Sequence, residues 1–392
     1  MKYDFNRVID RSNNYAVKYD ELGVKFGRED LCSMWVADMD FKSAKPIIDA
    51  IKERAEQGIF GYTSRPDTYY EAMINWYKRR YDWNIDKETI IHSPSVVTSL
   101  SVIMRNFTKP GDKIIVQSPV YYPFFNVVKN NGRELVLNPL IKVNGDYVMD
   151  YEDLEKKIDD DVKYLILCNP HNPVGRVWTK DELTRLGEIC IKNNVKIIAD
   201  EIHGDLVYGE RKYVPFASIS EEFSKNTITC VSATKTFNIA GLQASFAIFP
   251  DKDDYDKFED ILGILDLRRN NCFSLVAVEA AYRYGEEWLN QLLEYLEGNV
   301  QFLIDYCREN IPKIKPNKPQ GTYLVWIDCR ELGLSDEDLN DFMVNKARIA
   351  LDGGNWFGCE GEGYMRINIA SPRAILEEGI KRIEKAVKEN LE

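Results

Sequence analysis

Polar residues that can take part in catalysis or ligand binding follow five segments with the composition of buried strands. They include a carboxylate, an amide, a histidine, a tyrosine and a lysine, and in chain order they are Ser95, Tyr121, Asn172, Asp200, His203, Ser232 and Lys235. Ser95 precedes an amphipathic segment, where the backbone amides of Val96 and Val97 would be free at the positive end of a helix that can bind phosphate. Because open α/β sheets bind ligands beyond the carboxyl ends of their strands, we expect these groups to share one crevice.

The stretch TITCVSATKTFNIAGLQ, residues 227–243, ends a β-branched run on small residues and places Lys235 directly after them. Small residues leave room for a flat ligand, and Ser232 offers a hydroxyl to a phosphate. Burial should lower the pKa of Lys235 and favour the neutral amine that condenses with an aldehyde. These groups meet the needs of pyridoxal 5'-phosphate (PLP), which requires a lysine for a Schiff base, an acidic partner for its ring nitrogen, and phosphate ligands.

Each of these residues also has an ordinary structural explanation. Asp200 is a suitable helix N-cap, Asn172 a turn former before a proline, Tyr121 a core residue and His203 a satisfied polar residue. For any one position the structural explanation is the simpler one. Their joint placement at five strand ends favours a shared functional site.

The elements that must position these residues alternate along the middle of the chain. Residues 179–194 form an amphipathic pattern with Thr179 and Glu182 in the spacing of a capping box, between apolar runs at 162–169 and 195–201. This alternation predicts an α/β fold with a mostly parallel sheet covered by helices. After about residue 285 the pattern is less regular and begins with a long helical segment, which predicts a smaller α+β domain.

The length of 392 residues predicts about two domains. We place the N-terminal arm and part of the small domain at 1–45, a large cofactor-binding domain at 46–285, and the C-terminal small domain at 286–392. The net charge of −12 argues against nucleic acid or an anionic membrane as the main partner. No apolar run is long enough for a spanning helix, the first residues are not a signal peptide, and we expect a cytoplasmic protein.

The eight cysteines and three histidines show no metal-ligand spacing, and no metal is expected. In the reducing cytosol that we expect for this protein, disulfides would be unusual.

Three segments resemble the signature segments of fold-type I PLP-dependent enzymes, the class I/II aminotransferase superfamily: SATKTFNIAG (232–241), CNPHNPVGRVW (168–178) and ADEIHGDL (199–206). The resemblance extends from WVADMDF (35–41) to MRINIASPR (365–373), and it is closest to the cystathionine β-lyase branch of MalY/PatB-type C–S lyases. It implies PLP as the cofactor, a small amino-acid substrate and a homodimer with shared active sites.

The resemblance also implies a role for each candidate residue. Lys235 would form the Schiff base and transfer protons, Tyr121 would act as a proton donor, and Arg366 would bind the substrate α-carboxylate through two hydrogen bonds. The cofactor ligands would be Val96, Val97 and Ser232 at the phosphate, Tyr62 at the phosphate of the other subunit, Tyr121 on the ring face, Asn172 and His203 at the ring hydroxyl, Asp200 at the pyridine nitrogen, and Lys235.

One position departs from the wider superfamily. Many aminotransferases carry an arginine eight residues after the lysine, and this chain has Gln243. The lyase branch does not reliably have arginine there, so the departure agrees with the closer resemblance. The segment WVADMDF also resembles the lyase branch, although Trp35 and Met39 are equally well explained as core residues.

We therefore expect β-elimination from cystathionine or related S-substituted cysteines, giving a thiol, pyruvate and ammonia. The alternative within the superfamily is an aminotransferase that transfers the amino group to a 2-oxo acid. A nicotinamide dehydrogenase would carry G-x-G-x-x-G after its first strand, and GCEGEG at 358–363 has the wrong spacing and position. A catalytically silent regulatory protein would be expected to lose Lys235 or Asp200, and both are present.

Overall fold

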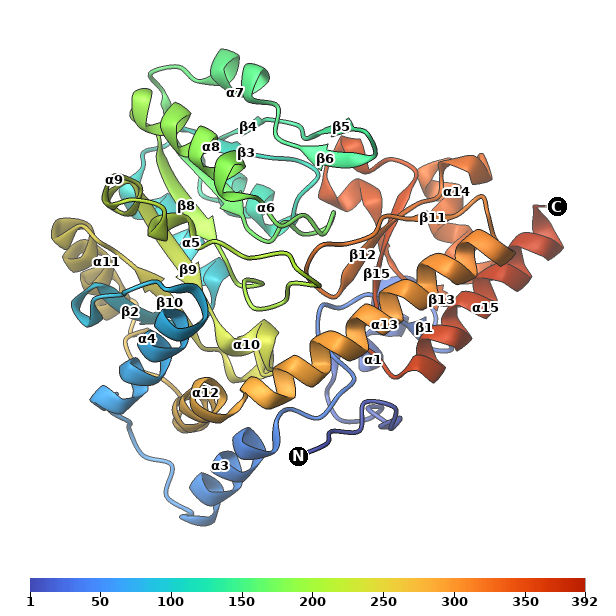
Figure 1. Cartoon of the computed structure of the whole chain (residues 1–392), viewed down its shortest axis with the longest axis horizontal. Coiled ribbons are helices and arrows are strands. Elements are labelled where there is room, and N and C mark those ends of the chain that lie inside the picture. The colour runs from blue at the N-terminus through green and yellow to red at the C-terminus, as the bar shows by residue number, and fades with distance from the viewer. Residues whose placement is uncertain (392) are drawn as a thin grey trace.

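A seven-stranded sheet forms the centre of the larger part of the computed structural model, which describes residues 1–391 (Figure 1). Its strand order is β2-β10-β9-β8-β7-β3-β4. The bounds are β2 Ile90–Ser93, β3 Lys113–Val116, β4 Glu134–Leu137, β7 Val162–Cys168, β8 Lys196–Asp200, β9 Thr227–Val231 and β10 Ser245–Ile248. Only β10 runs antiparallel to its neighbours, so the predicted mostly parallel sheet is confirmed.

Helices cover both faces of this sheet. The helices of this part of the molecule are α3 Lys45–Glu56, which packs on α12, and α4 Asp67–Tyr81, α5 Val96–Phe107, α6 Pro123–Asn130, α7 Tyr151–Lys157, α8 Lys180–Lys192, α9 Glu221–Lys225, α10 Ala233–Thr236, α11 Lys252–Ile264 and α12 Cys272–Tyr284. Along β7, Leu165 packs in the same apolar cluster as α8, whereas Ile166 packs with α5 and α6. This alternation explains why the central strands are apolar on both faces. The predicted capping box of Thr179 and Glu182 starts α8.

A smaller antiparallel sheet of four strands lies beside the first, in the order β11-β12-β15-β14. Its strands are β11 Lys315–Pro316, β12 Leu324–Asp328, β14 Asp352–Gly353 and β15 Tyr364–Asn368. In Figure 1, α13 Glu286–Asn310 and α15 Arg373–Asn390 lie next to each other on this side of the molecule. The helix α13 matches the long helical segment predicted after residue 285, while the domain boundaries stay a prediction.

Residues near the N-terminus join this smaller part of the molecule. The short strand β1, Cys32–Ser33, pairs in parallel with β13, Ile349–Ala350. The loop 34–41 then passes along the end of β15 before α3 begins. The remaining α-helices and strands are α1 Val17–Asp20, α2 Leu22–Phe26, the hairpin β5 Ile141–Val143 and β6 Asp146–Val148, and α14 Asp336–Asp341. Within residues 1–391, no helix combines the length and apolar character that crossing a membrane requires.

Candidate active site

A cavity of about 260 Å³ lies at the carboxyl ends of the central strands. Among the residues that line it are these predicted ones, which follow β2, β3, β7, β8 and β9: Val96, Val97, Tyr121, Asn172, Asp200, His203, Ser232 and Lys235. The structure thus brings them together, as the strand order leads one to expect. The individual roles assigned to them stay predictions, and neither Tyr62 nor Arg366 lines this cavity.

Lys235 lies on the short helix α10, directly after the carboxyl end of β9. Its Nζ donates a hydrogen bond of 2.7 Å to the carbonyl oxygen of Ala37. Burial lowers the pKa of Lys235 to about 8, although the nearby carboxylates of Asp38 and Asp200 oppose this effect and Arg366 adds to it. The expected direction of the shift is confirmed, and a sizeable share of the lysine is neutral just above neutral pH.

Asp200 is the last residue of β8, and its side chain is buried. Its Oδ1 accepts a hydrogen bond of 3.1 Å from the backbone amide of Ile202. Burial raises the pKa of Asp200 to about 7, because removal from water disfavours the charged carboxylate, and the Ile202 amide and the charge of Lys235 oppose this effect only in part. A protonated ring nitrogen would supply the missing positive charge.

His203 and Asn172 present hydrogen-bonding groups to the same cavity. Burial lowers the pKa of His203 to about 3, so its imidazole is neutral, and its buried Nδ1 has no partner within residues 1–391. The Oδ1 of Asn172 accepts a hydrogen bond of 2.9 Å from Arg366, so its amide nitrogen remains as a donor for a ligand. Both residues are therefore suited to a ring oxygen, as the sequence predicts.

Tyr121 lies on the loop between β3 and α6, and its backbone amide donates to the carbonyl of Asn172 at 3.0 Å. Burial raises the pKa of the Tyr121 hydroxyl to about 12. The hydroxyl therefore keeps its proton across the physiological pH range and can donate it.

The phosphate end of the cavity is the start of α5. Ser95 is the N-cap, and its Oγ accepts from the amide of Thr98 at 3.0 Å. The amides of Val96 and Val97 have no acceptor in the described part of the chain, as expected for the first residues of a helix. The amides and the positive end of the helix dipole together form an anion site.

Ser232 and Gln243 complete the wall of this end of the cavity. The Ser232 hydroxyl donates to the carbonyl of Ala244 at 2.6 Å and accepts from the amide of Thr234 at 3.0 Å. A phosphate contact would require this hydroxyl to turn away from Ala244. Gln243 is exposed at the rim with φ of 52° and brings no positive charge, so its neutral side chain leaves the helix amides as the main anion ligands.

Arg366 lies on β15 and approaches the site from the smaller sheet. The guanidinium is buried, forms an ion pair with Asp352, and lies 4.8 Å from the ring centroid of Phe357. Its Nε has no partner within residues 1–391. Arg366 reaches the cavity through Asn172 and keeps a donor for a carboxylate. Sequence reasoning missed Asp352, because nothing in its local pattern distinguishes it from a surface turn.

The Ala37 carbonyl is another group that sequence reasoning missed. It accepts from the Lys235 amine and also from the hydroxyl of Tyr323, at 2.9 Å. A backbone acceptor leaves no signal in side-chain types, and only the resemblance of the segment WVADMDF pointed to this loop. Trp35 and Met39 of the same segment are buried in apolar clusters, which supports the core-packing explanation for both.

Tyr62 lies far more exposed than the other predicted residues. It belongs to the loop between α3 and α4, and 92% of its surface is exposed. The guanidinium of Arg269 stacks over its ring at 4.7 Å from the centroid. Its predicted contact with the phosphate of another subunit stays a prediction.

Comparison with known proteins assigns the chain to a family. The model of the aminotransferase class I and II family matches residues 30–383. The chain therefore belongs to this family, and it has the fold-type I architecture expected from the sequence.

Within the family, the chain falls in the MalY/PatB branch of C–S lyases. It is 43% identical to the cystathionine beta-lyase PatB of Bacillus subtilis (strain 168), with 98% of this chain and 100% of PatB aligned. It is 31% identical to the protein MalY of Escherichia coli (strain K12), over 98% and 99% of the two chains. A PLP-bound aminotransferase-like protein from Clostridium difficile 630 is 57% identical, with a TM-score of 0.97 over 98% of this chain and 100% of that one.

Proposed function

We propose that this protein is a PLP-dependent carbon–sulfur β-lyase that acts on cystathionine or related S-substituted cysteines. The observation that carries the proposal is that Lys235 and Asp200 line one cavity at the strand ends, in a chain 43% identical to PatB over nearly its whole length. The substrate class comes from the relatives, and the cofactor fits the residues present.

The cavity fits PLP because each of its unsatisfied groups has a counterpart on that molecule. The free amides of Val96 and Val97 would hold the phosphate, and the carboxylate of Asp200, whose only partner in residues 1–391 is the Ile202 amide, would accept from the ring nitrogen. Asn172 and His203 would bind the ring hydroxyl. When bound, PLP supplies an aldehyde that carries the substrate amine and a protonated ring that accepts electron density from Cα.

The protein's own groups bind the substrate and move its protons. Arg366 would bind the α-carboxylate through the donors that Asp352 and Asn172 leave free. Lys235, whose pKa near 8 leaves part of it neutral, would take the α-proton onto Nζ. The Cα–H bond breaks in this step, and the carbonyl of Ala37 would hold the resulting ammonium.

Elimination then requires a proton for sulfur. The Cβ–S bond breaks with its electron pair on sulfur while a Cα=Cβ double bond forms. Tyr121 lies in the same cavity with its hydroxyl protonated and would donate to the departing thiolate. The three-carbon product reacts with water to give pyruvate and ammonia, which balances the reaction with the released thiol.

The test is to incubate the holoenzyme with cystathionine and with cystine and to measure pyruvate, thiol and ammonia. We expect the thiol and pyruvate in equal amounts, without added 2-oxo acid. Conversion of 2-oxoglutarate to glutamate, with no thiol or pyruvate from cystathionine, would assign the protein to the aminotransferases instead.

The same proposal includes a homodimer with shared active sites in the cytoplasm. A dimer is supported by the exposed apolar side chains of Ile59 and Phe60 on the same loop as Tyr62, since such side chains often mark an interface. The eight unpaired cysteines suit a reducing compartment. Sedimentation of the holoenzyme tests the dimer. Mixing Tyr62→Phe and Lys235→Ala subunits tests the sharing of sites, and full activity of an isolated monomer would exclude it.

A further inference from the structure

The loop that follows β1 carries the acceptor of the catalytic lysine. The Ala37 carbonyl accepts from Lys235 Nζ at 2.7 Å and from the Tyr323 hydroxyl at 2.9 Å. The acceptor belongs to a loop rather than to a strand or helix. Its position therefore depends on the contacts that fix the loop.

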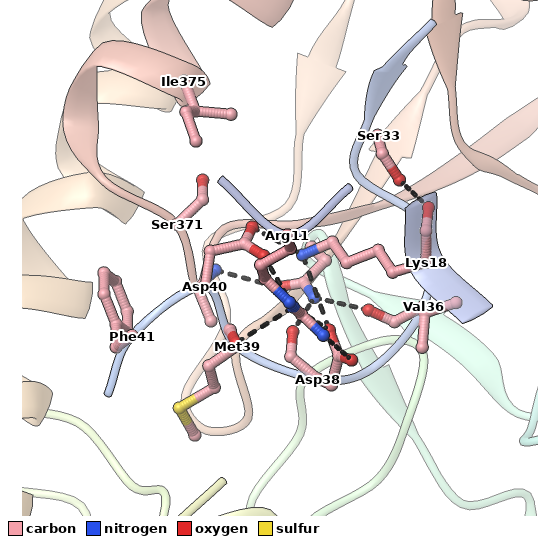
Figure 2. Close-up of polar contacts among 12 residues, drawn as sticks. Arg11, Lys18, Ser33, Val36, Asp38, Met39, Asp40, Phe41, Ser371 and Ile375 are labelled. Carbon is pink, nitrogen blue, oxygen red and sulfur yellow. Dashed lines mark hydrogen bonds and ion pairs between the residues drawn. The ribbon is translucent and has the colours of Figure 1, made fainter. Parts of the chain in front are cut away.

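Two basic residues of the N-terminal arm hold this loop (Figure 2). Arg11 donates to both carboxylate oxygens of Asp38, at 3.0 and 2.7 Å, and to Asp40 at 2.7 Å. The Nζ of Lys18 lies 2.8 Å from Asp40 and 3.8 Å from Asp38. We call Arg11, Lys18, Asp38 and Asp40 the arm cluster. The side chains of Lys18 and Asp40 are each 1% exposed and that of Asp38 is 24% exposed, so Asp38 is the member nearest to solvent.

Two asparagines fix the backbone of the same loop from other directions. Asn238, on the loop after α10, exchanges two hydrogen bonds of 2.9 Å with the backbone of Met39. Asn368, at the end of β15, donates to the carbonyls of Val36 and Asp38 at 2.6 Å. The loop is thus tied to the arm, to the lysine helix and to the strand of the carboxylate-binding arginine.

The arm cluster also faces the lysine. A second cavity of about 510 Å³, which adjoins the first, is lined by Arg11, Asp38 and Lys235 together. We propose that Asp38, whose charge Arg11 partly neutralises, is an electrostatic positioning residue that favours the charged form of the Lys235 nitrogen and keeps the Ala37 carbonyl on it. The inference rests on the proposed role of Lys235 in binding PLP.

Charged groups from several elements set the balance between the charged and the neutral form of the Lys235 nitrogen. Asp38 from the loop and Asp200 from β8 favour the positive charge, and Arg366 from β15 disfavours it. His203 is neutral, and the hydroxyl of Tyr323 shares the Ala37 carbonyl with the lysine. Arg11 and Lys18 act one step further away, because they partly neutralise Asp38. Removal of Asp38 or of Arg11 should therefore shift the balance in opposite directions.

The test is a pH titration of the absorbance of the lysine–cofactor linkage in the holoenzyme. The Asp38→Asn variant should titrate lower than wild type by about one pH unit, because a carboxylate near the cationic nitrogen is lost. The Arg11→Gln variant should titrate higher, because Asp38 then keeps its full charge. The Arg11→Lys variant should return toward wild type.

The matched control is Arg28→Gln, because Arg28 pairs only with Asp30 on the surface in the described chain. Its titration should equal that of wild type. Shifts in the same direction for Asp38→Asn and Arg11→Gln, or no shift in either, would overturn the proposal. If Asp38→Asn does not fold, the other two variants still test the proposal. Arg11→Gln should titrate higher than wild type, and Arg11→Lys should titrate nearer to wild type. A wild-type holoenzyme whose cofactor is not attached to Lys235 would instead contradict the proposed function.

Discussion

Two regions of the molecule meet at Lys235, and they differ in whether their buried polar and charged groups have partners within the protein. On the cofactor side, at the end of β8, the buried carboxylate of Asp200 accepts a hydrogen bond from the Ile202 amide and forms no ion pair within residues 1–391. The Nδ1 of His203, nearby, is without a partner there. On the arm side, the arm cluster places two basic and two acidic residues in mutual contact. Arg366 on β15 and Asp352 on β14 form a further buried pair.

The difference shows which groups are for a ligand and which are for the protein. An unpaired buried polar group costs free energy and is tolerated where a ligand will satisfy it. A buried ion pair holds its neighbours in place, and removal of one partner leaves an uncompensated charge. We therefore expect substitutions on the cofactor side to impair chemistry without destabilising the cofactor-free fold, and substitutions on the arm side to destabilise it.

The largest effect is expected at the point where the two regions meet. Lys235→Ala should abolish covalent attachment of the cofactor and lower turnover at least about a thousandfold, because the proton carrier is lost. The cofactor-free variant should unfold like wild type. Borohydride reduction followed by peptide mapping checks the attachment, with Lys225→Ala as the control, since Lys225 pairs with Glu221 on an exposed helix. A pyridoxyl label on another lysine of the wild-type protein would contradict the assignment.

The arm side should show the largest loss of stability. Asp40→Asn removes a carboxylate that pairs with both Arg11 and Lys18, and it leaves the buried Lys18 ammonium with only the more distant carboxylate of Asp38, at 3.8 Å. We expect the free energy of unfolding to fall by about 3 kcal/mol. Urea denaturation of the cofactor-free protein measures this value. The exposed Asp30 provides the control, because Asp30→Asn should change the value by less than about 1 kcal/mol. Equal values for the two variants would remove the distinction between the regions.

The ion pair of Arg366 and Asp352 lets us compare a residue proposed to bind substrate with a residue that only orients it. Arg366→Lys should lower kcat/KM about a hundredfold, or about 2.7 kcal/mol, because a lysine cannot form the two parallel hydrogen bonds to a carboxylate. Asp352→Asn should have a smaller effect, about tenfold and mainly in KM, because the guanidinium keeps Asn172 but loses its fixed orientation. Steady-state kinetics separate the two, and Arg330→Lys on the surface serves as control. If kcat/KM of Asp352→Asn fell as much as that of Arg366→Lys, the view that Asp352 only orients the guanidinium would be wrong.

The smallest effect is expected for Asp200→Asn in the cofactor-free protein, and its sign is opposite to that of Asp40→Asn. The raised pKa of Asp200, about 7, means that the native state keeps a proton that the unfolded chain has released. The free energy of unfolding therefore falls as the pH rises from about 4 to about 7. The variant lacks this dependence, so it should be more stable than wild type at about pH 8 and equal to it at about pH 4.

Thermal and urea unfolding at the two pH values test this prediction. The same variant should bind PLP more weakly, because the partner of the ring nitrogen is neutral. A variant that is less stable than wild type at both pH values would show that Asp200 supports the fold.

Much of the fold and of the cofactor side was predictable because its signals are local. Apolar runs, the capping box of Thr179 and the small residues before Lys235 each lie within a few positions of the feature that they predict. The parallel strand order then places the residue after each strand at one edge. Asp200 and Lys235 were found in this way. Arg366 and Tyr62 came from resemblance alone, since no local pattern marks them.

The contacts of the arm side depend on segments far apart in the chain, and no local pattern encodes them. The bond between Lys235 and the Ala37 carbonyl joins residues 198 positions apart, and that between Arg366 and Asn172 spans 194. The first of these pairs meets because β1 pairs with β13 and carries the loop 34–41 across the end of β15. The amino acids at the strand ends are thus set in the sequence. The atom that accepts the hydrogen bond of Lys235, and the charges that surround the lysine nitrogen, follow from how the smaller sheet and the N-terminal arm pack against the larger sheet.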